Sequence, residues 1–227
     1  MSPVACTILV VAKAPVPGFA KTRLAAKIGD VAAADLAAAA LLDTLDAVTA
    51  ANVTARVVAV TGDLNRAARS EELHELLSGY TVVEQRGGTF GERLAAAHHD
   101  SGAVFPGPLV QIGMDTPQVT GPLLTAAAKA LTDDGVDAVY GPACDGGWWA
   151  LGLTHPTLAR FLSTVTMSEP DTGARTLDAL RAVCPVVVEL PTLADFDTSR
   201  DVWTVAADLD PNCRFRRTAE ALGATSW

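Results

Sequence analysis

Short apolar runs rich in Val, Ile and Leu alternate along this chain with longer amphipathic runs rich in Ala and Leu. Such alternation is typical of stacked strand–helix units, in which strands buried on both faces form a mainly parallel sheet. The pattern predicts strands at residues 7–11, 56–60, 81–83, 109–112, 138–140, 148–153 and 186–190. It predicts helices at residues 32–50, 64–77, 90–99 and 123–131, with two further helices at the end of the chain.

No linker, charge block or internal repeat divides the sequence, so we expect one α/β domain over residues 1–227. No apolar run reaches the roughly 20 residues that a membrane span needs, and no basic segment precedes the first apolar run. We therefore expect a soluble cytoplasmic protein without a membrane span. The four cysteines form no CxxC pair, which favours free thiols over a zinc site.

The net charge of −9, from 17 Lys and Arg against 26 Asp and Glu, argues against nucleic acid as a ligand, because duplex binders need a basic face. Any phosphate ligand must then be held by local groups, a metal ion or backbone amides. The Ala-rich, apolar surface leaves room for a homodimer.

Ligands of open α/β sheets bind beyond the carboxyl ends of the strands, and polar clusters follow several of the predicted strands. The first is AKAPVPGFAKTRL at residues 12–24. Its three cations, Lys13, Lys21 and Arg23, could neutralise phosphate oxygens, or the segment could be a solvated basic loop. The spacing of a Walker A loop is absent.

Two further clusters supply carboxylates. Asp115 follows a predicted strand in GMDTP, residues 113–117, where it could bind Mg²⁺ or Mn²⁺ or cap the next helix. In ADFDTSRD, residues 194–201, an extended backbone would place Asp195 and Asp197 on the same side. Two neighbouring acids either bind a metal ion together or repel each other, and of these two interpretations metal binding is favoured. Thr198 or Ser199 would cap the following helix.

The segment GPACDGGWWALG, residues 141–152, combines Asp145 with two glycines that permit a tight turn and leave backbone amides open to a ligand. Trp148 and Trp149 should point to opposite faces, one into the core and one toward an acceptor. A plain hairpin with aromatic packing is the alternative. In QRGGTFGERL, residues 85–94, the glycines and the helix N-terminus could face a base or ribose. Surface or capping roles are expected for the four histidines.

The motifs KAPVPGFAKTRL, GMDTP, DGGWW and DFDT, in this order, resemble those of a bacterial GT-A-type glycosyltransferase-like family with the nucleotide-diphospho-sugar transferase fold. The pattern is more distantly similar to molybdenum cofactor guanylyltransferases and to the phospholactate/phosphoenolpyruvate guanylyltransferases of deazaflavin cofactor synthesis. The resemblance covers roughly residues 5–205. It implies a mixed, mainly parallel sheet flanked by helices, with a Rossmann-like first half that binds the nucleotide.

Residues and resemblance together assign the expected site. Expected metal ligands are Asp115, Asp197 and Asp195, although Asp115 is followed by Thr-Pro and not by a second acid as in Asp-x-Asp. Acceptor-binding residues are Asp145, Gly146, Gly147 and Trp148, with Asp145, Lys21 and Arg23 in catalytic roles. The nucleotide-binding residues are Ala12, Lys13, Pro17, Gly18, Lys21, Arg23, Gln85, Gly88, Gly91 and Met114.

These assignments predict a transferase that depends on Mg²⁺ or Mn²⁺ and uses a nucleotide-diphosphate donor. Glycosyl transfer from a nucleotide sugar to a small acceptor is favoured. Guanylyl or cytidylyl transfer from a nucleoside triphosphate to a small phosphorylated acceptor is the alternative. A non-catalytic nucleotide-binding protein is a third hypothesis.

Overall fold

The computed structural model describes residues 2–223, so Met1 and residues 224–227 of the expected domain lie outside the described part. Seven strands form one sheet in the order β3-β2-β1-β4-β6-β5-β7. Their bounds are β1 Val4–Lys13, β2 Val53–Thr61, β3 Thr81–Glu84, β4 Leu109–Gly113, β5 Ala138–Pro142, β6 Trp148–Leu153 and β7 Val187–Glu189. Only β6 runs antiparallel to its neighbours, so the predicted mixed, mainly parallel sheet is confirmed.

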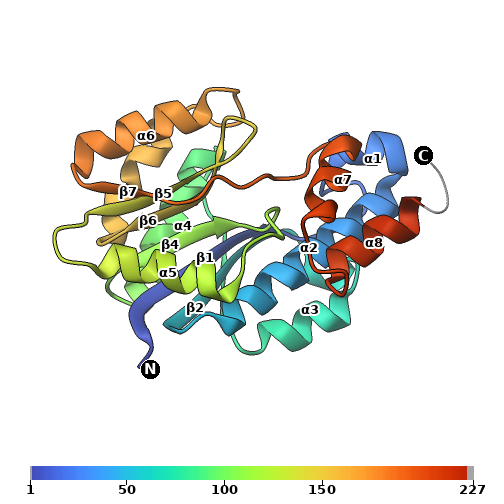
Figure 1. Cartoon of the computed structure of the whole chain (residues 1–227), viewed down its shortest axis with the longest axis horizontal. Helices are drawn as coiled ribbons and strands as arrows, with labels where there is room; N and C mark the ends of the chain where they lie inside the picture. The colour runs from blue at the N-terminus through green and yellow to red at the C-terminus, as the bar shows by residue number, and fades with distance from the viewer. Residues whose placement is uncertain (1, 224–227) are drawn as a thin grey trace.

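Helices cover both faces of the sheet (Figure 1). The α-helices are α1 Thr22–Ile28, α2 Asp30–Ala50, α3 Ser70–Leu77, α4 Phe90–Val104, α5 Gly121–Thr132, α6 Thr172–Val183, α7 Ser199–Ala207 and α8 Arg214–Gly223. Two 3-10 helices are η1 Leu64–Arg66 and η2 Pro156–Thr164. None of the helices within residues 2–223 is long and apolar enough to cross a membrane.

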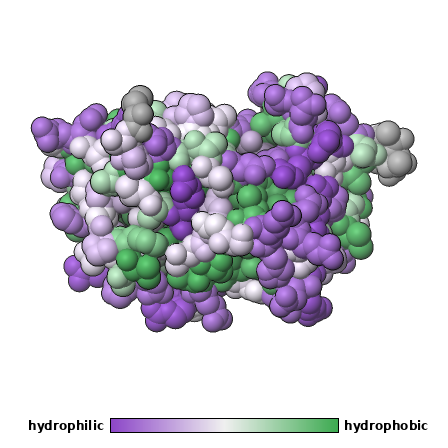
Figure 2. Space-filling view, turned by 90° about the horizontal axis from the view of Figure 1, so that it is seen from below, coloured by the Kyte–Doolittle hydropathy of each residue, from purple (hydrophilic) through white to green (hydrophobic). Residues whose placement is uncertain are grey.

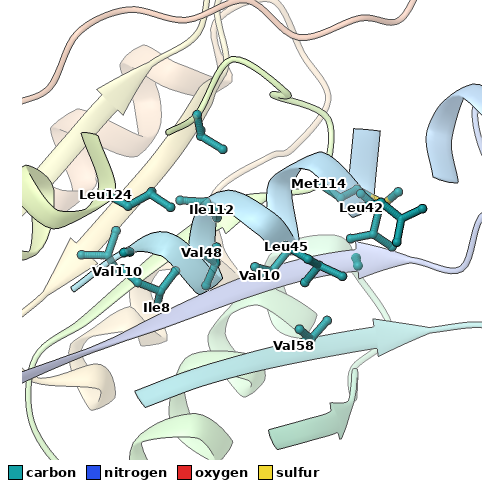
Figure 3. Close-up of a cluster of buried hydrophobic side chains, with 14 of the residues drawn as sticks. Ile8, Val10, Leu42, Leu45, Val48, Val58, Val110, Ile112, Met114 and Leu124 are labelled. Carbon is teal, nitrogen blue, oxygen red and sulfur yellow. The ribbon is translucent and has the colours of Figure 1, made fainter. Parts of the chain in front are cut away.

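The core on one side of the sheet is formed by α2, α3 and α5. In it, Leu42, Leu45 and Val48 of α2 lie over Ile8 and Val10 of β1 (Figure 3). Burying an aliphatic side chain of this size stabilises the fold by about 1.5–3 kcal/mol. Because β1 alternates its faces, Leu9 and Val11 point into the opposite core, which α4, η2 and α6 complete.

A third cluster joins the two ends of the chain. Helices α1, α2, α7 and α8 meet beside the sheet, at the right of Figure 1, and a long connection leads there from β7. Phe196 from this connection and Phe215 from α8 are fully buried, with ring centroids 4.5 Å apart. On the face seen in Figure 2, hydrophobic residues lie in separate patches between hydrophilic ones.

The predicted strands are all present, with ends shifted by zero to three residues. The predicted helix at residues 64–77 is divided into η1 and α3, because Arg69 adopts a left-handed backbone with φ 53° between them. The sequence pattern missed α1, η2 and α6. Helix α1 buries Leu24 only, which is too little for a visible amphipathic period.

Candidate functional site

The loops after β1 and β4 meet at one edge of the sheet, as predicted from the strand ends, and the connection after β7 joins them there. Lys21 lies in the loop after β1, and its Nζ is 2.7 Å from Asp115 Oδ2, just beyond β4. The same Nζ is 2.8 Å from Asp197 Oδ1, on the connection from β7 to α7. Arg23 Nη1 lies 3.3 Å from the other oxygen of Asp197. Three segments that are far apart in sequence therefore contribute side chains to one cluster of charged residues.

Lys21 is held in place from several sides. Its side chain is 7% exposed, and its Nζ lies 4.2 Å from the centroid of the Phe196 ring. Burial by itself lowers the Lys21 pKa, but the carboxylates of Asp115 and Asp197 outweigh it and raise that pKa above its ordinary value. The backbone of Lys21 is left-handed (φ 51°), a strained conformation for a non-glycine residue. The solvated-loop alternative is thus excluded for Lys21, whereas the Arg23 side chain is 74% exposed.

Asp115 does not cap the next helix. Helix α5 begins at Gly121, and the Thr120 hydroxyl accepts the cap hydrogen bond from the Leu123 N–H. The Asp115 carboxylate instead faces Lys21 with 39% of its side chain exposed. The capping alternative is therefore wrong, and Asp115 faces the site.

Asp195 and Asp197 both line one cavity, whereas Phe196 between them is fully buried in the third hydrophobic cluster. Thr198 caps α7 as predicted. Burial, followed by the negative charge of Asp145, raises the pKa of Asp195 to about 6. For Asp197, burial acts in the same direction, but Lys21 and Arg23 bring its pKa below the ordinary value.

Two cavities join at this charged group. The smaller one, of about 210 Å³, is lined by Lys13, Lys21, Arg23, Met114, Asp115 and Asp197 among others. The larger one, of about 880 Å³, shares Arg23, Asp115 and Asp197 and extends to Asp145, Trp148 and Asp195. The site can therefore hold two ligand groups on either side of one set of charges.

The smaller cavity is lined by the three cations of the predicted phosphate loop, Lys13, Lys21 and Arg23. The Lys13 ammonium lies 4.1 Å from the centroid of the Phe19 ring, and the Lys13 N–H donates to Met114 Sδ over 3.1 Å. Burial, followed by the charge of Arg93, lowers the Lys13 pKa. Among the other predicted residues, Ala12 is buried within β1, whereas Pro17 and Gly18 are exposed in the loop.

The turn at Asp145 is a hairpin between β5 and β6, and it corrects the expectation that its amides are open. The Gly146 N–H donates to the Ala143 carbonyl, and the Gly147 N–H donates to Asp145 Oδ1 over 2.8 Å. Gly146 has φ 88°, and a Cβ there would lie 2.0 Å from the Pro170 carbonyl oxygen. These glycines therefore serve the turn and its packing.

The two tryptophans diverge as predicted. Trp149 is 3% exposed in the core, and its Nε1–H donates to the Pro191 carbonyl over 2.9 Å. Trp148 is partly exposed and lines the larger cavity. The hydrogen bond of Trp149 fixes the start of the connection that carries Asp195 and Asp197.

The segment before α4 differs from its prediction. Gln85 donates through Nε2 to the carbonyls of Ala12 and Ala59, which ties it to β1 and β2. The Gly88 N–H donates to Glu92 Oε2, and Thr89 and Glu92 form a complete capping box. Gly91 is buried, and a Cβ there would lie 2.2 Å from the Leu162 carbonyl oxygen.

These contacts have two consequences for the prediction that the segment faces a nucleotide. The glutamate of the capping box takes up the amide of Gly88, which is therefore not open to a nucleotide. Gly91 allows close packing between α4 and η2, and its place beside a nucleotide stays a prediction.

Sequence reasoning missed Gln111. This residue lies on β4 opposite Leu9 of β1 and Leu151 of β6, is 2% exposed, and lines the larger cavity. Its side chain lies beside the fully buried His98 of α4, whose pKa is lowered by burial and raised to a smaller extent by a hydrogen bond with Gln111. The available signal was a polar residue inside the apolar run LVQIG.

The carboxylates suit a hard divalent cation, since Asp115 and Asp197 already point oxygens at one cation, the Lys21 ammonium. In the described part of the chain, no group of three or more His, Cys, Asp or Glu side chains could hold a metal ion alone. Mg²⁺ is usually bound by one or two carboxylates together with substrate phosphates, and this site offers that number of carboxylates.

Solved structures with the same fold come from several transferases. A protein from Desulfovibrio desulfuricans G20, described as a candidate nucleotide-diphospho-sugar transferase, superposes with a TM-score of 0.82 at 23% identity, over 99% of this chain and 96% of that one. A cytidylyltransferase from Leptospira borgpetersenii serovar Hardjo-bovis gives 0.54 at 14% identity, over 97% and 94%. Glucosyl-3-phosphoglycerate synthase from Mycobacterium tuberculosis, solved with Mn²⁺ and uridine diphosphate, gives 0.52 at 13% identity, over 97% and 78%.

These likenesses establish the nucleotide-diphospho-sugar transferase fold for the chain. A search of curated proteins found no match. A family model matches residues 44–169, which is more than half of the sequence, and carries the predicted GMDTP and DGGWW motifs. The protein therefore belongs to the family described as "Uncharacterized protein conserved in bacteria (DUF2064)".

Proposed function

We propose that this protein is a metal-dependent transferase that uses a nucleotide-diphosphate donor, and that it transfers a glycosyl group from a nucleotide sugar to a small acceptor. One observation carries the proposal. Lys21, Asp115 and Asp197, from three distant segments, form a single charged group where a small cavity and a large cavity meet. A donor and an acceptor need such an arrangement, because the bond that breaks must lie between them.

The small cavity suits the phosphates of the donor. Lys13, Lys21 and Arg23 all line it, in a protein that is otherwise acidic. Arginine can bind phosphate oxygens bidentately and lysine acts as a point charge. In this proposal these three cations bind the diphosphate and stabilise the charge that develops on it as it leaves.

Asp115 and Asp197 would hold the divalent cation, together with the donor phosphates. When bound, the cation supplies Lewis-acid stabilisation of the leaving diphosphate. Lys21 occupies the space between the two carboxylates, so it would turn from them to the phosphates when the metal and donor enter. Asp195 lies beside this pair and adds negative charge that favours a cation.

On the other side, Asp145 and Trp148 line the cavity proposed for the acceptor. Asp145 would orient the acceptor hydroxyl and take its proton as the new glycosidic bond forms. The bond between the anomeric carbon and the diphosphate oxygen breaks in the same process, and the nucleoside diphosphate leaves with the electron pair. Trp148 would provide a flat apolar wall for the acceptor.

Nucleotidyl transfer is the competing reaction on this fold, and a cytidylyltransferase is among the similar structures. The two reactions differ in their products, since glycosyl transfer releases a nucleoside diphosphate and nucleotidyl transfer releases pyrophosphate. Incubating the protein with nucleotide sugars and, separately, with nucleoside triphosphates, with Mn²⁺ or with chelator, therefore distinguishes them.

The proposal predicts metal-dependent release of nucleoside diphosphate from a nucleotide sugar. Asp115→Asn should slow this release at least tenfold, about 1.4 kcal/mol of barrier. Asp134→Asn, an exposed position outside both cavities, is the matched control and should retain the wild-type rate. If pyrophosphate is released from a triphosphate instead, the reaction is nucleotidyl transfer and the proposal of glycosyl transfer is wrong. If neither kind of donor is consumed, the proposal that the protein is a catalyst is refuted.

A further inference from the structure

The ammonium group of Lys13, the last residue of β1, is held by an aromatic ring. It lies 4.1 Å from the centroid of the Phe19 ring, and Phe19 follows it in the same loop. Among residues 2–223, no carboxylate forms an ion pair with Lys13. Burial and the charge of Arg93 both lower the Lys13 pKa. Lys13 therefore brings a positive charge to the wall of the smaller cavity that no described acid neutralises.

The second lysine of this cavity is held differently. The Lys21 ammonium also lies near an aromatic ring, 4.2 Å from the centroid of Phe196. Two carboxylates, from Asp115 and Asp197, are however within 2.8 Å of it. A phosphate that binds Lys21 must compete with these carboxylates. An aromatic ring has no net charge, so it attracts and orients an ammonium group without neutralising it.

The backbone of the loop after β1 fixes the Phe19 ring. The Ala14 N–H donates to the Thr61 carbonyl over 2.8 Å, which ties the start of the loop to β2. The Phe19 N–H donates to the Val16 carbonyl over 2.9 Å. The ring packs directly on Gly62, where a Cβ would lie 2.6 Å from Phe19 Cε1. A side chain at position 62 would therefore occupy the place of the ring.

We propose that Phe19 is a positioning residue for the donor, because its ring holds the Lys13 ammonium at the smaller cavity and leaves the charge free for a phosphate group. This inference rests on the proposed function, in which the smaller cavity binds the donor diphosphate. It divides the work between the two lysines. Lys13 meets the incoming phosphates directly, whereas Lys21 must first leave its two carboxylates.

The affinity for inorganic pyrophosphate tests this role, since pyrophosphate has the charged groups of a diphosphate without the nucleoside. Calorimetric titration at pH 7 with Mg²⁺ measures it. We expect Phe19→Leu to weaken binding about two- to fivefold, as the loss of one exposed cation–π contact allows. Phe19→Tyr keeps an aromatic ring and should bind like the wild type. Phe105→Leu, at the end of α4 and outside both cavities, is the matched control and should also bind like the wild type.

A double-mutant cycle separates positioning of Lys13 from a general effect on the loop. Lys13→Met should weaken pyrophosphate binding about tenfold, as the loss of a charged hydrogen bond allows. Adding Phe19→Leu to Lys13→Met should cause no further loss, because the ring then has no ammonium to hold. A loop that is merely disturbed would lose the same factor in both backgrounds. Thermal unfolding checks that each variant is folded, which is expected for Phe19 because its side chain is exposed.

The inference is overturned if Phe19→Leu binds pyrophosphate like the wild type, or if it causes the same loss with and without Lys13. It is also overturned if Phe19→Tyr binds as weakly as Phe19→Leu, or if pyrophosphate does not bind the wild type. Failure of the proposed function gives a different result. In that case Phe19 and Lys13 are coupled in pyrophosphate binding, but no nucleotide sugar or triphosphate is consumed in the product assay.

Discussion

Lys21 and Asp197 are separated by 176 positions in the chain, yet the Lys21 ammonium lies 2.8 Å from a carboxylate oxygen of Asp197. The same ammonium lies 2.7 Å from Asp115. Without this cation the two carboxylates would repel each other. The lysine therefore joins the loop after β1, the end of β4 and the segment before α7 into one charged site.

Replacing Lys21 with methionine should destabilise the protein by about 1–3 kcal/mol, because two carboxylates lose a charged hydrogen-bond partner. Both carboxylates are about two-fifths exposed, which keeps the cost below that of a fully buried pair. Urea unfolding would measure the loss. Lys27→Met, at an exposed position on α1, which begins directly after Lys21, should cost little.

The effect of Mn²⁺ on the stability of Lys21→Met tests whether the two carboxylates bind a metal ion. If Asp115 and Asp197 form a metal site, Mn²⁺ should restore more stability to Lys21→Met than it adds to the wild type, because the ion no longer competes with the ammonium. Equal effects of Mn²⁺ on both proteins would show that these carboxylates do not bind the ion.

Gly146→Ala should be more destabilising than Gly135→Ala. Both glycines have φ in the left-handed region, 88° and 83°, so both variants incur the backbone cost of about 1–2 kcal/mol. A Cβ at Gly146 would also meet the Pro170 carbonyl oxygen at 2.0 Å, whereas one at Gly135 meets nothing within 4 Å. Chemical denaturation should therefore separate the two variants by at least 1 kcal/mol. Equal losses would mean that the turn can move away from Pro170 without cost.

The strands were the most predictable part of the fold. Runs such as LVQIG on β4 are continuous and apolar, and they end at polar residues that fall at one sheet edge. This was enough to predict that Lys21 and Asp115 lie at the same edge of the sheet, whereas Asp197 was placed with them by the family resemblance. The family resemblance, carried by four short motifs, added the nucleotide-diphospho-sugar transferase fold.

The contacts that decide what each site residue can do were not predictable from the sequence. Spacing gives no sign that the amides of Gly146 and Gly147 are already paired within their turn, or that Gly91 lies under the Leu162 carbonyl. The contact at Gly91 depends on η2, and the Gly146 carbonyl accepts a hydrogen bond from the Gly173 N–H of α6; the sequence pattern missed both helices. Gln111 was overlooked because strand patterning treats a single polar residue as an interruption.

His98 should make stability depend on pH. It is fully buried on α4, contrary to its expected surface role, and burial lowers its pKa from about 6.5 to about 3. Between these values the unfolded chain binds a proton that the folded protein does not. The free energy of unfolding should therefore fall as the pH falls from about 6.5 toward 3, by up to about 1.4 kcal/mol per pH unit from this residue.

The variant His98→Leu cannot bind that proton, so its free energy of unfolding should fall less steeply over the same range. His155→Leu, at an exposed position, is the matched control and should keep the wild-type slope. Urea unfolding at pH 4.5 and 7.5 gives both slopes. If His98→Leu and the wild type lose the same free energy between these pH values, His98 is protonated in the folded protein as well.

The most direct test of the central claim is the thermal stabilisation of the protein by nucleotides. A ligand at one hundred times its dissociation constant adds about 2.7 kcal/mol to the free energy of unfolding. For a chain of this size, each kcal/mol typically raises the melting temperature by about 2–4 °C. We predict that a nucleotide sugar or nucleoside diphosphate with Mn²⁺ raises the melting temperature of the wild type. Chelator should abolish this rise, and so should the variant Asp197→Asn. The control variant Asp178→Asn, exposed on α6, should preserve it. A rise that survives both chelator and Asp197→Asn, or no rise with any nucleotide, would contradict the account.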